Sequence, residues 1–284
     1  MRRVRLLFGV PVLFVLVLGA ALLAAHPSFA KTAAKPKAHA KHRAPARAAR
    51  PTAPVIDPQA RELVQKMSNY LASLPRFTVH TDTTQQVVFP SGLVLDSDRA
   101  ADIAVERPNH VKAHVMSAKR NVEMYYDGSN VSLYSPDQKL YTTRPAPATI
   151  DQLIVRARDE QGLNLPAADF LFQNPYDRVM AKVQRGSYVG KALINGVMTD
   201  QLAFRQKGAE WQLWIQEGDR PLPVRLAIKD KTVKGSPWYM VTMTNWDTAP
   251  QFAPGMFAFT PPPGAQRIPA TTLAELRARR MARK

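Results

Sequence analysis

The chain has 284 residues, with 39 lysines and arginines against 22 aspartates and glutamates, and it contains no cysteine. Disulfide bonds, a thiol nucleophile and the acylated cysteine of a lipoprotein are therefore excluded. The net charge of +17 lies mainly at the two ends, because residues 1–60 and 271–284 hold 15 basic residues but only the acidic Asp57 and Glu275. The body between them keeps 24 basic and 20 acidic residues, a balance that argues against nucleic-acid binding.

The N-terminus has the pattern of an export signal. Three arginines within the first five residues precede an uncharged apolar run over residues 6–25, and Ser28-Phe29-Ala30 places small residues where a signal peptidase reads them. We predict a signal peptide over residues 1–30, cleavage after Ala30 and a periplasmic protein. The apolar run is also long enough to cross a bilayer as a helix, so an uncleaved inner-membrane signal anchor is the alternative.

Two further segments are predicted to lie outside the folded domain. Residues 31–56 are rich in Ala, Lys, Pro and Arg, and a segment with so little apolar surface cannot offset the entropy of ordering. We expect a disordered basic linker that acts as a flexible tether or contacts an anionic membrane surface. The basic C-terminal tail, residues 270–284, is expected to be solvated or to form a short helix at such a surface. The folded domain is then expected over residues 57–269.

The folded part is predicted to begin with a helix. Asp57-Pro58 is typical of an N-cap followed by the first helical residue, apolar residues recur at helical spacing after it, and Pro75 ends the helix. From Phe77 the apolar period changes to two, which is typical of strands. The strands expected in this first half are residues 77–89, 93–106, 110–117, 121–126, 131–134 and 140–143.

Two short helices are predicted to interrupt the strands. Thr149 and Gln152 form a capping-box pattern, and Gly162 follows the last turn of the helix expected over residues 149–161. A second short helix with a large apolar cluster is expected over residues 166–172. Strands then resume, and they are expected at residues 178–189, 191–205, 210–216, 222–229, 238–246 and 256–259.

The segment from Trp211 to Ile228 indicates how these strands are used. Apolar residues occupy every second position in each of its two strands, which predicts an antiparallel sheet with one apolar and one polar face. Many strands with helices at only two points indicate an α+β fold, here a single strongly curved antiparallel β-sheet with helices packed on its concave face. The two apolar rows are Trp211, Leu213 and Ile215, and then Leu222, Val224, Leu226 and Ile228.

Several motifs resemble a known family. The hairpin at residues 126–136, with its Tyr-Asp-Gly and its later Tyr and Pro, is similar to one in the LolA/LolB-like lipoprotein carriers. The sequences LAFR (202–205), WQLWI (211–215), PLP (221–223) and FAFTPPPGA (257–265) resemble domain-of-unknown-function family 2092, predicted periplasmic proteins of that superfamily.

This resemblance implies a LolA-like half-barrel, which is an unclosed antiparallel barrel whose helices pack on the concave face. It also implies an acyl-sized apolar cavity between the sheet and the helices. Members of the family often carry a Cys and a His just before the LAFR sequence, where this chain has Thr199-Asp200-Gln201. No role of those two side chains is therefore carried over to this chain.

No pattern in the sequence indicates catalysis. A nucleophile elbow, a phosphate-binding loop, a zinc-protease helix and a dinucleotide fingerprint are all missing from it. His110 and His114 would share one face of a strand but lie about 13 Å apart, too far to bind one metal. Asp96, Asp98 and Asp102 lack the glycine and the final glutamate of a calcium loop. We expect no catalytic residue, no metal and no cofactor.

The predicted function is that of a non-enzymatic, monomeric carrier for a lipid or for the acyl chain of a lipoprotein. The two short helices would form its lid, and a larger side chain at Ala203 or Val241 should fill its cavity. An envelope-stress sensor that binds a protein partner is the alternative, and a hydrolase is a third hypothesis. The residues expected to line the cavity are Phe170, Phe172, Phe204, Trp211, Leu213, Ile215, Leu226, Val241 and Met243. A filled apolar core is the alternative to a cavity lined by these side chains.

Overall fold

A computed structural model describes residues 55–160, 163 and 165–270. The predicted signal peptide, the linker up to residue 54 and the tail from residue 271 lie outside the described residues, as does the end of the predicted helix at residues 161–162. Among the described residues, no helix is long and apolar enough to span a membrane. The helical elements are α1 (Pro58–Ser73), α2 (Ile150–Asp159), the 3₁₀ helix η1 (Pro166–Leu171) and α3 (Pro175–Met180).

All described strands belong to one sheet. They are β1 (Val55–Ile56), β2 (Arg76–Val88), β3 (Val94–Glu106), β4 (His110–Ser117), β5 (Arg120–Tyr126), β6 (Asn130–Ser135), β7 (Leu140–Pro145), β8 (Val183–Ile194), β9 (Val197–Gln206), β10 (Ala209–Gln216), β11 (Pro223–Asp230), β12 (Trp238–Asp247) and β13 (Gln266–Arg267).

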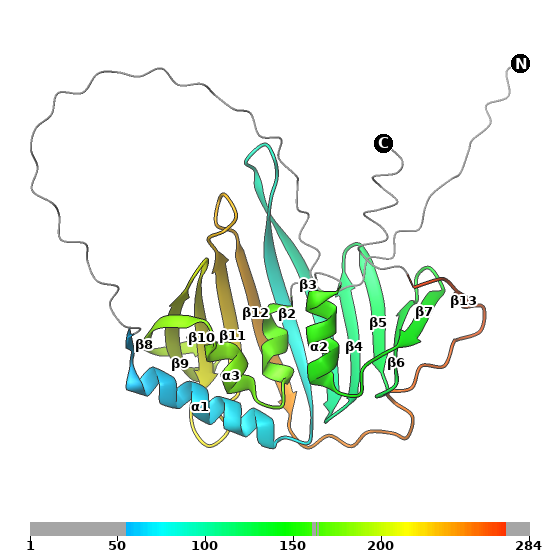
Figure 1. Cartoon of the computed structure of the whole chain (residues 1–284), viewed down its shortest axis with the longest axis horizontal. Helices are drawn as coiled ribbons and strands as arrows, with labels where there is room; N and C mark the ends of the chain where they lie inside the picture. Colours follow the sequence, from blue (N-terminus) through cyan, green and yellow to red (C-terminus); the bar gives the residue numbers. More distant parts are fainter. Residues whose placement is uncertain (1–54, 161–162, 164, 271–284) are drawn as a thin grey trace, which may run out of the picture.

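The order across this 13-stranded sheet is β1-β8-β9-β10-β11-β12-β2-β3-β4-β5-β6-β7-β13. Neighbouring strands are antiparallel, except that the two-residue edge strands β1 and β13 pair parallel with β8 and β7. Because β1 and β13 lie at opposite ends of this order, the sheet is unclosed. It is strongly curved, and the helices all lie on one of its faces, which we call the inner face (Figure 1). The predicted α+β fold, a single curved antiparallel sheet with helices packed on one face, is confirmed.

Local capping explains where the two longer helices begin. The Asp57 side chain accepts a hydrogen bond from the backbone N–H of Gln59 at 2.9 Å, and Pro58 follows as the first helical residue. The Thr149 hydroxyl likewise accepts one from the N–H of Gln152 at 3.2 Å. Each cap satisfies a backbone donor that has no partner inside the helix. Both N-caps predicted from the sequence are therefore confirmed.

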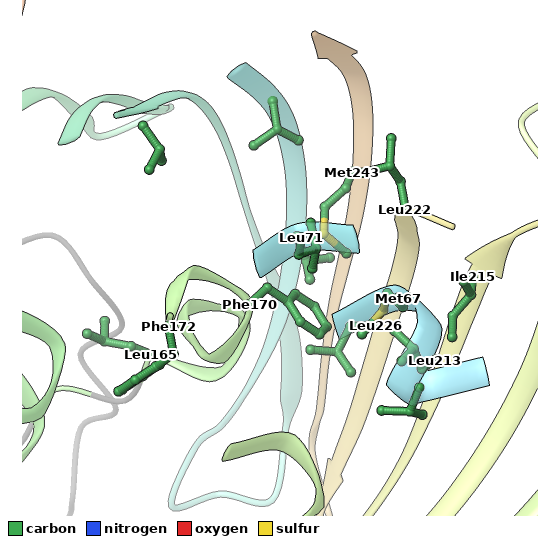
Figure 2. Close-up of a cluster of buried hydrophobic side chains, with 14 of the residues drawn as sticks. Met67, Leu71, Leu165, Phe170, Phe172, Leu213, Ile215, Leu222, Leu226 and Met243 are labelled. Atoms are coloured by element: carbon green, nitrogen blue, oxygen red, sulfur yellow. The ribbon is translucent and has the colours of Figure 1, made fainter. Parts of the chain in front are cut away.

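The main hydrophobic core lies between the inner face and the helices. On α1, buried residues recur every three or four positions at Ala60, Val64, Met67 and Leu71, the spacing that places them on one side of a helix. Figure 2 shows the ring of Phe170 from η1 directed toward α1 and β11. Burying each such side chain stabilises the fold by about 1.5–3 kcal/mol relative to exposure.

The second predicted apolar row is divided between the two faces. Leu222 and Leu226 pack into the main core, but Val224 is buried in a smaller cluster on the outer face with Ile194, Trp214 and Ala227. The register between β10 and β11 shifts between Trp214 and Ile215. A bulge of this kind inserts an extra residue and interrupts the alternation of faces. The expectation of one wholly polar face was therefore wrong at this point.

Three predicted strand boundaries in the second half were also wrong. Residues 178–180, predicted to start a strand, end α3, which Asn174 caps and Pro175 opens. The strand expected to stop at residue 189 continues through a bulge at Gly190 to Ile194, and the chain reverses at Asn195-Gly196. Both reversal residues have positive φ angles, a conformation that Asn and Gly adopt readily.

The third boundary concerns the C-terminal segment. Residues 256–259, predicted as a strand, form turns instead, and the segment packs its rings onto the outer face of β4–β7. Phe257 stacks on His110 with 5.3 Å between ring centroids, and Phe259 lies within 5.2–5.7 Å of the rings of Tyr125, Tyr134 and Tyr141. The apolar residues at these positions thus serve packing against a sheet face rather than strand pairing.

Candidate functional site

The structure brings together all nine residues predicted to line a cavity. Each is at most 6% exposed, and all belong to the single core cluster under α1 and η1. The register of the strands places the sheet residues side by side. Trp211 pairs with Phe204, Leu213 with Leu226, and Leu226 with Val241. These residues therefore form one continuous apolar layer on the inner face. It stays a prediction that some of these residues line a ligand cavity.

Ala203, named as a position where a larger side chain should fill the cavity, lies on the other face. It pairs with Gln212 in β10 and Ser187 in β8, and its two neighbours in the strand, Leu202 and Phe204, are both buried. Because successive residues of a strand point to opposite faces, Ala203 faces outward and that expectation was wrong. Val241, 1% exposed, does lie in the core.

The segment from α2 to Phe172, which we call the lid segment, is braced by its own polar contacts. Arg158 joins the Asp169 carboxylate at 2.7 Å and donates to the Leu165 carbonyl at 2.6 Å. Asp151 accepts a hydrogen bond from the N–H of Gln173 at 3.0 Å. These contacts join α2 to η1 and to the residue after Phe172, and Phe170 and Phe172 are buried.

Few hydrogen bonds among the described residues tie the lid segment to the sheet. The backbone N–H of Ile150 donates to the Pro108 carbonyl at 2.9 Å. Just before the segment, the hydroxyl of Tyr126 donates to the Pro147 carbonyl at 2.5 Å, and burial raises the pKa of Tyr126 to about 12. The third contact is made by Arg107, whose Nη1 donates to the Leu171 carbonyl at 2.6 Å.

Arg107 is the most unusual charged residue of the inner face. It follows β3 directly, and its Cζ lies 5.9 Å from the centroid of the Phe77 ring. Its Nε and Nη2 are buried and have no hydrogen-bond partner among the described residues. Burial lowers the pKa of Arg107, and the nearby Asp151 acts in the opposite direction. A guanidinium stays charged even so, and a buried charge with unmet donors is costly unless an anion satisfies it.

A second buried arginine lies near the other end of α2. Burial lowers the pKa of Arg144 on β7, the nearby Arg156 lowers it further, and Glu160 opposes both. Arg156 and Glu160 form an ion pair at 2.8 Å. The inner face therefore has a partly buried cation near each end of α2, beside an otherwise apolar layer.

Two surface hollows accompany these features. One, of about 440 Å³, is lined by Asp151, Gln152, Val155, Arg156, Asp159, Glu160 and Arg178. The other, of about 500 Å³, lies over β8–β12 and is lined by Arg185, Gly186, Ser187, Ala203, Phe204, Arg205, Glu210, Trp211, Gln212, Lys229 and Trp238. Phe204 and Trp211 are the two predicted lining residues that reach either of these hollows.

The histidines are used in pairwise contacts. His80 Nδ1 lies 2.6 Å from the Asp102 carboxylate, and this hydrogen bond raises the pKa of His80 against the opposing effect of burial. His114 contacts Asn121 at 2.8 Å, and His110 lies 3.5 Å from Glu106. Within the described part of the chain, no three His, Cys, Asp or Glu residues are placed to hold a metal ion.

Sequence reasoning missed Arg107 and Arg144. In the sequence, each is a single arginine beside a proline at a strand end, the ordinary pattern of a solvated turn residue. The burial of Arg107 depends on η1, whose Leu171 carbonyl accepts a hydrogen bond from Arg107 more than sixty residues earlier in the chain. Arg144 lies near Arg156 and Glu160, at the end of α2. The position of Arg107 directly before Pro108 was an available signal. A residue before proline is held in extended backbone, so Arg107 continues the direction of the preceding strand.

Comparison with known sequences shows the family that the chain resembles. The sequence model of the family described as "Predicted periplasmic protein (DUF2092)" matches residues 60–270. No curated protein matches the chain. The similar solved structures include the lipoprotein LppX of Mycobacterium tuberculosis, with 16% identity over 69% of this chain and 98% of that one and a TM-score of 0.46.

Two other similar structures are LprF of Mycobacterium bovis and the LolA superfamily protein NE2245 of Nitrosomonas europaea. LprF has 15% identity over 72% of this chain and all of its own, with a TM-score of 0.44. NE2245 has 10% identity over 70% of this chain and 97% of its own, with a TM-score of 0.36. Identities this low transfer no function.

Proposed function

The chain belongs to the family of predicted periplasmic proteins DUF2092, and we propose that it is a non-enzymatic binding or carrier protein for an anionic amphiphile. The ligand would be a lipid or the acyl chain of a lipoprotein. The protein would act in the periplasm, after cleavage of the signal peptide at Ala30. The apolar layer of the inner face would take the acyl chain, and the lid segment would cover it.

One observation carries this proposal, namely a buried guanidinium with two unmet donor groups beside a continuous apolar layer. An acyl chain gains about 0.8 kcal/mol for each methylene that it buries, so the apolar layer would supply most of the affinity. A carboxylate or phosphate head group would accept hydrogen bonds from Nε and Nη2 of Arg107. Such charge-assisted bonds are about twice as strong as neutral ones. The site therefore favours anionic over neutral amphiphiles.

The lid segment supports a route for entry. Its polar contacts are mostly internal, and the Arg107–Leu171 hydrogen bond joins it to the sheet beside the proposed head-group site. Opening this segment would break few hydrogen bonds to the sheet, but it would also expose the buried rings of Phe170 and Phe172. A bound acyl chain would have to replace that apolar burial. Displacing Phe170 and Phe172 together would uncover the apolar layer for a chain of similar bulk.

The test compares a fluorescent fatty acid with its uncharged methyl ester on delipidated protein. We expect the Arg107→Gln variant to bind the fatty acid about tenfold or more weakly, because a hydrogen bond to a charged group contributes about 1.5–3 kcal/mol. Binding of the ester should be unchanged. The control is Arg120→Gln, which removes an exposed arginine and should leave both affinities as in the wild type.

Native mass spectrometry of protein purified from its own periplasm should show a co-purified anionic amphiphile. An equal loss of both probes in Arg107→Gln would assign that residue to lid packing instead of head-group binding. If folded, delipidated wild-type protein gave no saturable signal with either probe, the carrier proposal would fail. A protein-binding sensor would then become the leading function.

A further inference from the structure

The β2–β3 hairpin projects well beyond the rest of the sheet (Figure 1). The last pairs that join it to neighbouring strands are Gln85 with Tyr239 on one side and Ala100 with Met116 on the other. Beyond Gln85 the two strands pair only with each other as far as Val88 and Val94. At about 3.3 Å per residue, the free part of the hairpin extends about 10 Å past β12.

The tip of this hairpin is apolar and uncharged. Residues 87–95 read VVFPSGLVL, and the large side chains among them are exposed, with Phe89 at 43%, Leu93 at 56%, Val94 at 39% and Leu95 at 46%. Val233, in the loop after β11, adds a further apolar side chain that is 43% exposed. A contiguous exposed apolar patch marks an interaction surface rather than an ordinary strand turn.

The turns at the same end of the sheet are basic. Antiparallel alternation places the β4–β5, β6–β7, β9–β10 and β11–β12 turns at the end from which the hairpin projects. These turns contain Lys119, Lys139, Lys207, Lys231 and Lys234 but only one acidic residue, Asp137. The turns at the opposite end contain three acidic residues, Asp127, Glu217 and Asp219, against two basic ones, Arg107 and Arg220. The molecule therefore presents an apolar wedge surrounded by lysines at one end and a more acidic surface at the other.

We propose that this end docks onto an anionic lipid bilayer, with the hairpin tip inserted among the head groups. The free length of about 10 Å matches the depth of about 5–10 Å that interfacial segments reach. The first charged residue down the hairpin is Asp96, paired with Gln86, and it would stay at head-group level. Lys231 is paired with Glu210 at 3.2 Å, so the lysines that would face the phosphates are Lys119, Lys139, Lys207 and Lys234. Basic residues are attracted to such a surface within about a Debye length of 10 Å.

The experiment uses single-cysteine labelling, which is clean because the chain has no cysteine. Leu93→Cys and Leu193→Cys each receive an environment-sensitive fluorophore, in protein purified as exported. Leu193 is the matched control because it is also exposed and apolar, at 64%, but lies at the opposite end of the sheet. On phosphatidylglycerol-rich vesicles we expect the emission of the fluorophore at residue 93 to shift to the blue and to be quenched by lipid-borne quenchers. The fluorophore at residue 193 should show neither effect. Phosphatidylcholine vesicles should give a much weaker response.

Sedimentation with the same vesicles provides the second measurement. Phe89→Ser with Leu93→Ser should lower binding about tenfold or more, whereas Leu193→Ser with Met198→Ser should bind as the wild type does. A label at residue 93 that stays in water on anionic vesicles would overturn the proposal. If that label responded only to an added protein fraction, the tip would bind a protein instead. Fatty-acid binding in vesicle-free solution should be unchanged in the Phe89 and Leu93 variant, so this test is independent of the carrier proposal.

Discussion

Two kinds of buried residue occur on the inner face: apolar side chains, and a charged side chain with two donors unpaired among the described residues. Leu213 is fully buried, pairs with Leu202 and Leu226, and belongs to the main core cluster. Arg107 lies at the border of the same layer, and two of its buried donors have no partner among the described residues. The first kind of residue stabilises the fold, whereas the second kind is costly to the fold unless a ligand satisfies it.

Leu213 offers a direct test of the register. Leu213→Asp should destabilise the domain by several kcal/mol, about 3–5, because an unpaired carboxylate would be buried. Thermal unfolding followed by circular dichroism measures this. Gln212→Asp is the control, since Gln212 is on the outer face of the same strand and should tolerate a charge. A Leu213→Asp protein that melts like the wild type would show that Leu213 is not in the core.

His80 is predicted to make stability depend on pH. Its protonated ring donates to the Asp102 carboxylate, and this bond raises the pKa of His80 above 6.5. The contribution to stability is therefore fully present below about pH 6.5 and is lost as pH rises through the higher folded-state pKa. Denaturant unfolding should show a larger deficit for His80→Gln at about pH 5 than at about pH 9. An equal deficit at both values would mean that the Asp102 contact does not depend on the charge of His80.

At the scale of elements, the lid segment and the sheet differ in how they are stabilised. The strands of the sheet are held by long antiparallel ladders on both sides, whereas α2 depends on its N-cap, on Ile154 and Ile150 as buried anchors, and on contacts within the lid segment. An element with few buried residues opens more readily than a central strand. The lid segment is thus the part of the described fold best suited to move.

The N-cap of α2 gives the corresponding prediction. Thr149→Ala removes the hydroxyl that accepts from the Gln152 N–H and should cost about 1 kcal/mol of helix stability. Hydrogen exchange should quicken in α2 but stay unchanged in β10 and β11. Gln152→Ala is the matched control, because it keeps the backbone N–H that Thr149 binds. Exchange that quickened equally in the sheet would show that the lid segment does not open separately.

At the scale of the whole molecule, the two proposals fit one arrangement. The apolar layer and Arg107 lie between the sheet and the lid segment, and the apolar hairpin tip with its surrounding lysines lies at one end of the sheet. A carrier that docks by this end would take up or release its ligand beside a membrane. The net charge of the chain resides mainly in its termini, which would add a nonspecific attraction to the same surface.

Export is the prediction that concerns the complete chain. Residues 1–30 have the pattern of a cleavable signal, so N-terminal sequencing of the protein from periplasmic extract should begin at Lys31. Sedimentation analysis of this material should give a monomer. An intact N-terminus on membrane-bound material would establish the signal anchor instead, and the hairpin would then be held near the membrane by its own chain.

The sequence alone determined the features that depend on neighbouring residues. Asp57 and Thr149 were recognised as caps because a helix start needs a side-chain acceptor within three residues. The strands of the first half were placed within two residues of their observed bounds, since alternation reports which side of a strand is buried. Seven of the nine core residues followed from the same alternation together with the family resemblance, whereas Phe170 and Phe172 followed from the apolar cluster of a predicted short helix.

Only the tertiary structure decided the features that depend on distant partners. The bulge opposite Trp214 moved Val224 to the outer face, and the C-terminal segment placed Phe259 on the tyrosines of β5–β7. Arg107 became buried because η1, more than sixty residues later in the chain, covers it. The lysine turns meet at one end because of the strand order. Local sequence patterns indicate which apolar residues are buried, but they do not identify the distant element that buries a residue. The apolar layer could therefore be predicted from the sequence. The buried cation beside it and the basic end of the sheet could not.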